Sequence, residues 1–433
     1  MEKIKWVNHA SFIFEYKDVK LICDPWLEGA VFNDGWKHLV QSEFSYTDFS
    51  NITHIWFSHE HPDHFSPPNI KKIPPEIRAN ITVLYQVTQD KKVVSFCKQL
   101  GFKSVVELMP EIPYLLAKEL TLINAPVGNE RDSWLCIRTP NFTLLNLNDC
   151  AFEKTEKENL ADLQKIKKQT GAVKIDILFT QFSYASWAGN KEDVAFRKKC
   201  AQHMCNQITW EIAVFNPSFV VPFASYVWFC HEDNFYMNDY PNKIDVIHDF
   251  IKSRGAQSVV LFPGDEWDMK SQFNSQFAID RYLKCSTETV NQNNIIKKPL
   301  VTIDELKKSA KYYAQESLKL NHAPRLLQFN PFSFFLNDHQ KAFSFSFKDG
   351  LKEISLVKDC CDISLSTQAL KYCFDYLWGF DTLHISGRFQ KPLNGNFLNF
   401  QEYQYLSTLN NQGGRIGNKF NSAIKRIKTI FVR

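Results

Sequence analysis

Short apolar runs separated by polar turns occupy the first 265 or so residues, and they predict strands interspersed with helices. We expect strands at 5–7, 11–16, 19–23, 55–58, 81–86, 176–182, 219–223 and 258–262, and a hairpin at 134–138 and 142–146. Helical patterns lie at 90–100, 156–168, 191–215 and 245–254. Because helices alternate with mostly apolar strands, this region predicts an α/β fold in which helices cover sheets.

The pattern changes after residue 265 and again near residue 324. Residues 266–323 predict a helical connector, in which the capping box formed by Thr302 and Glu305 starts a helix. Residues 324–433 show strands, then a helix, then a strand, with a hairpin of 342–347 and 351–357 about Asp349-Gly350. We therefore expect a first domain at 1–265, a helical connector at 266–323 and a C-terminal α/β accessory domain at 324–433.

Composition and charge narrow the classes of function. The 433 residues include 37 phenylalanines, enough for a sizeable core, and a net charge of +4 from 51 basic and 47 acidic residues. Such a balance argues against nucleic acid as a partner. The chain has no apolar run long enough to span a membrane and no apolar signal segment at its start, so we expect no stable membrane insertion.

The 11 cysteines are scattered without a CxxC pair, which predicts reduced thiols and a cytoplasmic protein. A Rieske cluster would need two Cys-x-His pairs, and the chain has none.

Potential metal ligands are most concentrated at residues 59–64, where three of the 12 histidines fall within six positions. His59, His61, Asp63 and His64 follow an apolar strand, and a strand end can turn such side chains toward one point. Four nitrogen and oxygen donors at this spacing predict a site for one metal, or for two metals about 3.5–4 Å apart. Imidazole with carboxylate suits zinc, iron or manganese, and the motif alone does not choose among them.

This motif resembles the signature of the metallo-β-lactamase superfamily. Asn8-His9-Ala10 and Asp24-Pro25-Trp26-Leu27 are similar to that superfamily's branch of broad metal-dependent hydrolases. The resemblance implies an αββα sandwich and a bridge between two metals at Asp149, which ends the segment 144–149. Segments 221–226 and 383–389 resemble the metallo-β-lactamase-like portion of the CMP-N-acetylneuraminate monooxygenases, here without their Rieske domain.

Two positions depart from the pattern of the family. Gly128 stands where a third-site histidine is expected, and Ala224 follows the proline of the late strand where the last histidine is expected. Four residues are candidates to complete the ligand set: Asn129, Glu130, Asp132 and His231. We rank His231 first, because it lies shortly after the 219–223 strand in the segment that resembles the monooxygenases.

Two further residues have both a supporting and a purely structural interpretation. His9 either orients a metal ligand or is a satisfied core histidine, and the Asn-His-Ala context favours the first role. Asp24, at the end of the third strand, either supports a ligand in the same way or caps a turn. The later segment 361–388 resembles part of a sterol-carrier-like α/β domain, which implies a ligand-holding module or, more simply, a packing or dimerisation module.

The resemblance leaves three functions open. The first is a metallohydrolase that uses metal-activated water, with one or two divalent ions (zinc or iron) and Asp63 as the catalytic residue that orients the water or takes its proton. The second is an iron-dependent oxygenase of a nucleotide sugar or related metabolite, which would need an external electron-transfer partner. The third is a degenerate metal-binding scaffold. We expect a small-molecule substrate and a possible homo-oligomer.

Overall fold

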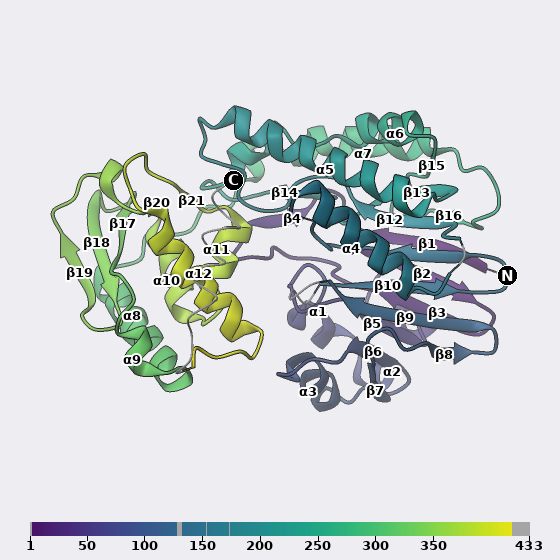
Figure 1. Cartoon of the computed structure of the whole chain (residues 1–433), viewed down its shortest axis with the longest axis horizontal. Helices are drawn as coiled ribbons and strands as arrows, with labels where there is room; N and C mark the ends of the chain where they lie inside the picture. Colours follow the sequence, from purple (N-terminus) through teal and green to yellow (C-terminus); the bar gives the residue numbers. More distant parts are fainter. Residues whose placement is uncertain (1, 128–131, 153, 173, 418–433) are drawn as a thin grey trace.

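The computed structural model describes residues 2–127, 132–152, 154–172 and 174–417. Two parts lie side by side in Figure 1: two large sheets with their helices at the right, and a smaller sheet with its own helices at the left. In the described part of the chain, no helix has both the length and the apolar character needed to cross a membrane.

The first sheet has seven strands in the order β16-β1-β2-β3-β5-β6-β7. Its strands are β1 (Glu2–Asn8), β2 (Ser11–Tyr16), β3 (Val19–Cys23), β5 (His54–Phe57), β6 (Thr82–Gln86), β7 (Ser104–Leu108) and β16 (Glu266–Trp267). The strands from β3 to β7 run parallel, whereas β16, β1, β2 and β3 are antiparallel. Alternation sends Phe12 and Phe14 of β2 into the main core and Ile13 to the opposite face.

The second sheet also has seven strands, in the order β15-β13-β12-β11-β10-β9-β8. Its strands are β8 (Tyr114–Ala117), β9 (Leu120–Pro126), β10 (Ser133–Arg138), β11 (Thr143–Asn146), β12 (Ile177–Gln181), β13 (Phe219–Phe223) and β15 (Gln257–Ser258). A separate two-stranded sheet joins β4 (Trp36–His38) to β14 (Val227–Phe229). Apolar residues from both large sheets meet in one core, so the sheets pack face to face.

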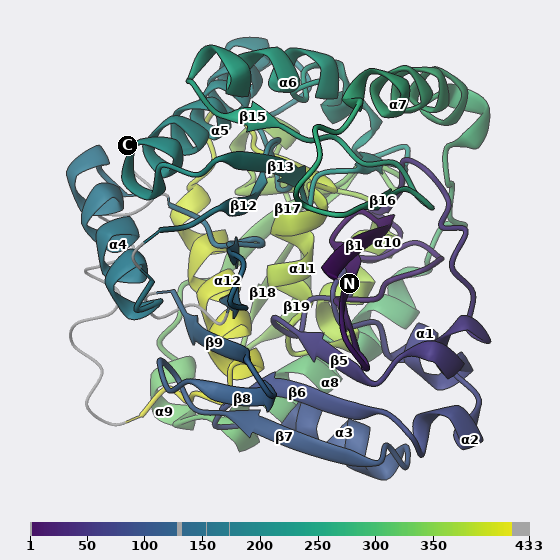
Figure 2. The same cartoon turned by 90° about the vertical axis from the view of Figure 1, so that its right-hand side faces the viewer.

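Helices cover the outer faces of this pair of sheets (Figure 2). On the side of the first sheet lie α1 (Pro67–Lys72), α2 (Pro75–Arg78) and α3 (Lys92–Gln99). On the side of the second sheet lie α4 (Glu156–Gln169), α5 (Val194–Phe215), α6 (Ile244–Ser253) and α7 (Ser275–Thr289). The four layers form the αββα sandwich that the sequence predicts.

The C-terminal part is a second α/β unit with its own core. Its five-stranded sheet has the order β19-β18-β17-β20-β21. The strands are β17 (Phe332–Leu336), β18 (Lys341–Ser346), β19 (Gly350–Ile354), β20 (Ile363–Leu365) and β21 (Phe389–Gln390). The helices are α8 (Ile303–Leu320), α9 (Ala323–Leu326), α10 (Thr367–Asp375), α11 (Gly379–Ser386) and α12 (Phe397–Asn411). Its α/β character agrees with the sequence, and the likeness to sterol carriers stays a prediction.

Two expectations change in detail. The predicted connector 266–323 does not stand apart, because α7 packs into the first core through Tyr282 while α8 packs into the C-terminal core through Tyr313. Residues 324–433, expected as strands, then a helix, then a strand, contain a further helix, α11, before the last strand. Gly387, at φ +65°, ends that helix in the left-handed conformation that glycine adopts easily, so β21 begins only at Phe389.

Candidate metal centre

The 59–64 loop begins where β5 ends, at the carboxyl edge of the parallel part of the first sheet. Facing it from the second sheet are Asp132, just before β10, and Asp149, shortly after β11. His9 lies in the turn between β1 and β2. Loops at the carboxyl ends of parallel strands are the usual place for a site in such folds, because the strand ends converge there.

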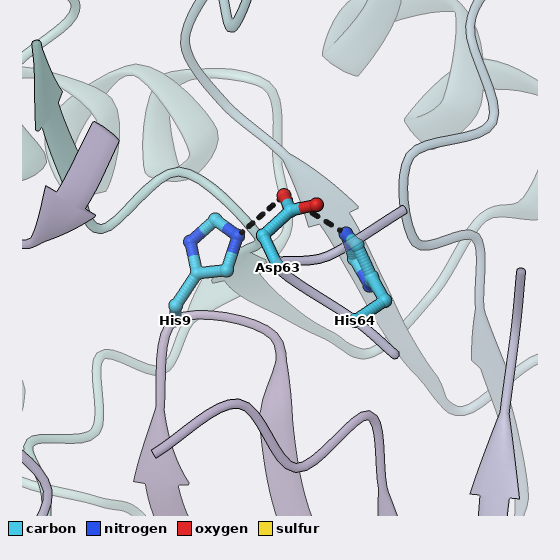
Figure 3. A group of neighbouring side chains, drawn as sticks. All are labelled: His9, Asp63 and His64. Carbon is cyan, nitrogen blue, oxygen red and sulfur yellow. Dashed lines mark ion pairs between the residues drawn. The ribbon is translucent and has the colours of Figure 1, made fainter. Parts of the chain in front are cut away.

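Three overlapping groups of side chains place one ligand atom each within 4.8 Å of one another. The groups are His59, His61 and Asp132; His59, His64 and Asp149; and His9, Asp63 and His64. Because His59 and His64 each belong to two groups, the three form one continuous cluster. Figure 3 shows the last group, in which the carboxylate of Asp63 lies between the two imidazoles, 3.4 Å from Nε2 of His9 and 3.3 Å from Nε2 of His64.

Asp24 fixes the tautomers of two of these histidines. Its Oδ2 lies 3.0 Å from Nδ1 of His64 and accepts the hydroxyl proton of Ser58 at 2.8 Å. Since that hydroxyl donates to Asp24, it must accept from Nδ1 of His59, which is 2.8 Å away. Both histidines therefore carry a proton on Nδ1 and turn Nε2 toward the cluster. This is how outer carboxylates orient metal-binding histidines.

Nε2 of His64 faces two carboxylates. It lies 2.9 Å from Oδ2 of Asp149 and 3.3 Å from Oδ2 of Asp63. A lone pair surrounded by two acceptors is unfavourable, and either a proton on His64 or a cation between the groups relieves the repulsion. The neighbouring Oδ1 atoms of Asp63 and Asp149 and both nitrogens of His9 are buried without a well-formed hydrogen bond. The residues present thus fit a metal ion.

The electrostatics of the cluster are those of tightly opposed charges. Burial and the neighbouring histidines His64 and His61 hold the pKa of His59 well below its usual value. Burial alone would lower the pKa of His64, yet Asp149, Asp63 and Asp24 raise it well above its usual range. Burial would likewise lower the pKa of His61, but Asp132 and Asp381 raise it. The imidazoles and carboxylates therefore compete for the same protons.

The structure brings together five of the six residues expected as metal ligands: His59, His61, Asp63, His64 and Asp149. The sixth, His231, belongs to none of the three groups. Its ring instead faces the side chain of Asp233, with 3.3 Å between Nδ1 and Oδ2, and accepts the backbone N–H of Asp233 at 3.2 Å. Ranking His231 first was therefore misleading, because closeness along the chain to β13 does not turn the loop after β14 toward the cluster.

Two other residues lie at the cluster where His231 does not. Asp132, one of the four candidates, reaches His59 with 3.5 Å between Oδ1 and Nε2, and His9 reaches Asp63 directly. Gly128, Asn129 and Glu130 lie outside the described residues. Ala224, at φ +48°, donates its backbone N–H to the carbonyl of His9, so the late strand supports His9 in place of supplying a histidine of its own.

One histidine near the cluster, His38, could not be recognised from the sequence. His38 of β4 is half-buried with both ring nitrogens buried, stacks on Trp26 with ring centroids 3.6 Å apart, and lies beside His9. Burial, and then the neighbouring His9, lower its pKa to about 3, so this ring is neutral. Only the pairing of β4 with β14 carries it there.

Residues 3–111 match the family model described as "Beta-lactamase superfamily domain". This part of the chain is therefore similar to a domain of the β-lactamase superfamily.

Its relatives include proteins named as iron-sulfur proteins and as hydroxylases. A putative Rieske 2Fe-2S iron-sulfur protein of Mycolicibacterium smegmatis is 24% identical over 232 residues, which cover 50% of this chain and 42% of that protein. The cytidine monophosphate-N-acetylneuraminic acid hydroxylase of Sus scrofa is 35% identical over 148 residues, covering 33% of this chain and 34% of the hydroxylase. The chain thus spans half or less of the length of these relatives.

Among solved structures, the isothiocyanate hydrolase from Delia radicum gut bacteria aligns with a TM-score of 0.43 at 13% identity, covering 63% of this chain and 99% of that one. CmlA, a diiron β-hydroxylase from Streptomyces venezuelae, aligns with a TM-score of 0.43 at 15% identity, covering 61% of this chain and 54% of that one.

Proposed function

We propose that the cluster holds two divalent metal ions and that the protein is a metal-dependent hydrolase of a small-molecule substrate. The observation that carries the proposal is the position of Nε2 of His64, which lies between the carboxylates of Asp63 and Asp149 at 3.3 and 2.9 Å. His59, His61 and Asp132 would hold one ion, and His9, Asp63 and His64 the other. Asp149 lies against both His59 and His64, where a bridging carboxylate is expected.

A bound metal would supply Lewis acidity, lowering the pKa of a water molecule and polarising the carbonyl or phosphoryl group to be attacked. Imidazole nitrogens together with carboxylate oxygens suit zinc, iron or manganese. The remaining work belongs to the protein. Asp24 and Ser58 keep His59 and His64 in the ligand tautomer. Oδ1 of Asp63, buried and without a partner, is the atom we assign to accept the proton of the attacking water.

The test is metal analysis of protein purified without added metal, joined to hydrolysis assays on ester, amide and phosphoester panels. We expect close to two metal ions per chain. Replacing His59 and His61 together by alanine should remove one of them and reduce hydrolysis by more than about a hundredfold. The matched control is His248→Ala on α6, a half-buried histidine outside the cluster. Absence of bound metal, or a double variant with unchanged metal and activity, would overturn the proposal.

A second function rests on the donor set and on the relatives. Carboxylates from Asp63, Asp132 and Asp149 make the cluster richer in oxygen than a histidine-only shell, which suits iron as well as zinc. Curated relatives are named as hydroxylases. We propose as the alternative an iron-dependent oxygenase of a nucleotide sugar or similar metabolite, served by a separate electron donor. Substrate-dependent oxygen uptake with iron bound would favour it, and turnover under strict anaerobiosis would eliminate it.

A further inference from the structure

The turn after Val31 has an unusual backbone. Three consecutive non-glycine residues, Phe32, Asn33 and Asp34, have φ of 52°, 56° and 59°. L-residues visit this left-handed region singly, because the Cβ atom then crowds the following carbonyl oxygen. A run of three persists only where the surrounding structure holds it in place.

The C-terminal domain supplies much of that support. Arg388, fully buried, donates from Nη1 to the carbonyl of Asn33 at 2.5 Å, and Gln368 donates to Oδ1 of Asn33 at 2.8 Å. Lys298, in the segment before α8, pairs with Asp34 at 2.9 Å. Arg388 is itself anchored, because both its Nε and its Nη2 donate to Oδ2 of Asp233, at 3.1 and 2.9 Å.

Helix α11 of the C-terminal domain also touches the turn. A Cβ added to Gly35 would lie 2.7 Å from Cβ of Ser386, so the two backbones meet without room for another methyl group. Asn234 spans the junction, since its Nδ2 donates to the carbonyl of Gly35 at 3.0 Å and to that of Ser386 at 2.7 Å. These contacts therefore hold the turn in one position against the C-terminal domain.

The side chain of Phe32 connects the turn to the proposed metal centre. Phe32 is buried, and its ring lies against the ring of His61, with centroids 5.7 Å apart and planes at 72°. His61 belongs to the group with His59 and Asp132, and to neither of the other two groups. Whatever moves Phe32 therefore acts on one half of the cluster.

We propose that the C-terminal domain positions His61 of the metal centre through the left-handed turn Phe32–Asp34, with Arg388 and Gln368 as the residues that hold the turn. The inference rests on the proposed metal centre and adds a role for the accessory domain. Phe32 fixes the plane of the His61 ring, and the contacts of Arg388 and Gln368 fix Phe32. These are positioning residues, because none of them belongs to the ligand groups.

The experiment is competition for Zn²⁺ between the full-length protein and a chromophoric chelator, with both binding steps fitted. Phe32→Ala should lower about tenfold the affinity for the ion that His61→Ala loses, as loss of an outer partner does. It should leave unchanged the affinity for the ion that Asp63→Ala loses. Gln368→Ala should weaken the same ion by a few-fold, and Phe32→Leu should restore most of the affinity. Arg388 itself is left intact, because its removal would strand the carboxylate of Asp233.

A matched control is Asn190→Ala, which removes hydrogen bonds to Lys391 across the domain junction without touching the turn. It should bind both ions as the parent does. If the parent binds Zn²⁺ at both steps, and Phe32→Ala and Gln368→Ala bind both ions with the affinities of the parent, the inference is overturned while the metal centre stands. Equal weakening of both ions, shared by Asn190→Ala, would also overturn it, since the domain would then only stabilise the fold. A parent that binds no Zn²⁺ would remove the proposed function and this inference with it.

Discussion

The metal-site loop and the core of the C-terminal domain are both buried, but their side chains are of opposite kinds. Asp63 and His64 are 1% and 0% exposed, and polar atoms of the cluster lack partners. Phe345 is also 0% exposed, and its ring lies 4.9 Å from that of Phe374 and 5.9 Å from that of Tyr403. The one polar atom of Tyr403 is satisfied, because its hydroxyl donates to the carbonyl of Asn330 at 3.1 Å.

The difference separates a buried region whose burial favours folding from one whose burial opposes it. Burial of aromatic rings stabilises the folded state by its area and by the edge-to-face geometry of the rings. Burial of carboxylates and imidazoles opposes folding unless a partner neutralises them. The aromatic core should therefore be indifferent to metal, whereas the cluster should depend on it.

The largest effect should come from the aromatic core. Phe345→Ala removes a ring that contacts Tyr313, Phe347, Phe374 and Tyr403. We expect a loss of about 4 kcal/mol in the free energy of unfolding, measured by denaturant titration, from the lost transfer energy and the cavity that remains. Metal content should not change. Loss of metal from a folded variant would show that the two regions are not separate in this sense.

Metal removal tests the other side of the comparison. Chelation should lower the free energy of unfolding by roughly 3 kcal/mol when the free metal had been a few hundred times its Kd, because the ion binds only the folded chain. The stabilisation should return on adding Zn²⁺. In the Asp63→Ala protein, which lacks one ligand group, the same chelation should cost less. An identical loss in that variant would assign the effect to a metal bound elsewhere.

The contrast also explains how far the sequence carries. His59 to His64 are recognisable because the ligands are neighbours in the chain, and Asp149 because a family resemblance points to it. Asp132 and His9 come together only through the packing of two sheets, so chain spacing did not rank them. His231 seemed closer in sequence, but its ring faces the nearby Asp233, which Arg388 holds at the domain junction.

The fold follows the same rule. Strands that are short apolar runs, such as β2 and β13, were predictable, and so was the capping box at Thr302. β7 and β8 were missed, because each is a sheet edge of mostly intermediate burial with no regular apolar face. Helix α11 was not expected, since its apolar residues Leu383 and Ile385 suit a helix or a strand and only Gly387 marks the end.

A buried acid without any cation sharpens the comparison further. Glu211 of α5 is fully buried and accepts from Gln207 at 2.9 Å, and burial raises its pKa to about 8. The folded protein therefore holds a proton on Glu211 that the unfolded chain releases above about pH 4.5. Stability contributed by this group is present at low pH and is lost as pH rises toward 8, by about 2 kcal/mol between about pH 6 and 8. Glu211→Gln should flatten that part of the stability profile, measured by urea titration at several pH values. A profile equally steep in the variant would contradict the buried neutral acid.

The smallest effect should separate the two domains themselves, because the same device starts a helix in each. Thr302 caps α8 with Glu305, and Thr155 caps α4 with Glu158; each threonine accepts the backbone N–H of the glutamate. Removing such a cap costs about 1 kcal/mol of helix stability. Thr302→Ala should lower the unfolding midpoint of the C-terminal domain and leave Zn²⁺ affinity unchanged. Thr155→Ala should lower the unfolding midpoint of the N-terminal domain. Hydrogen exchange of the backbone amides within each sheet measures the two midpoints separately. If the polar junction around Arg388 couples the domains strongly, each variant would shift both midpoints by the same amount, and the contrast drawn between the two regions would be one of chemistry alone.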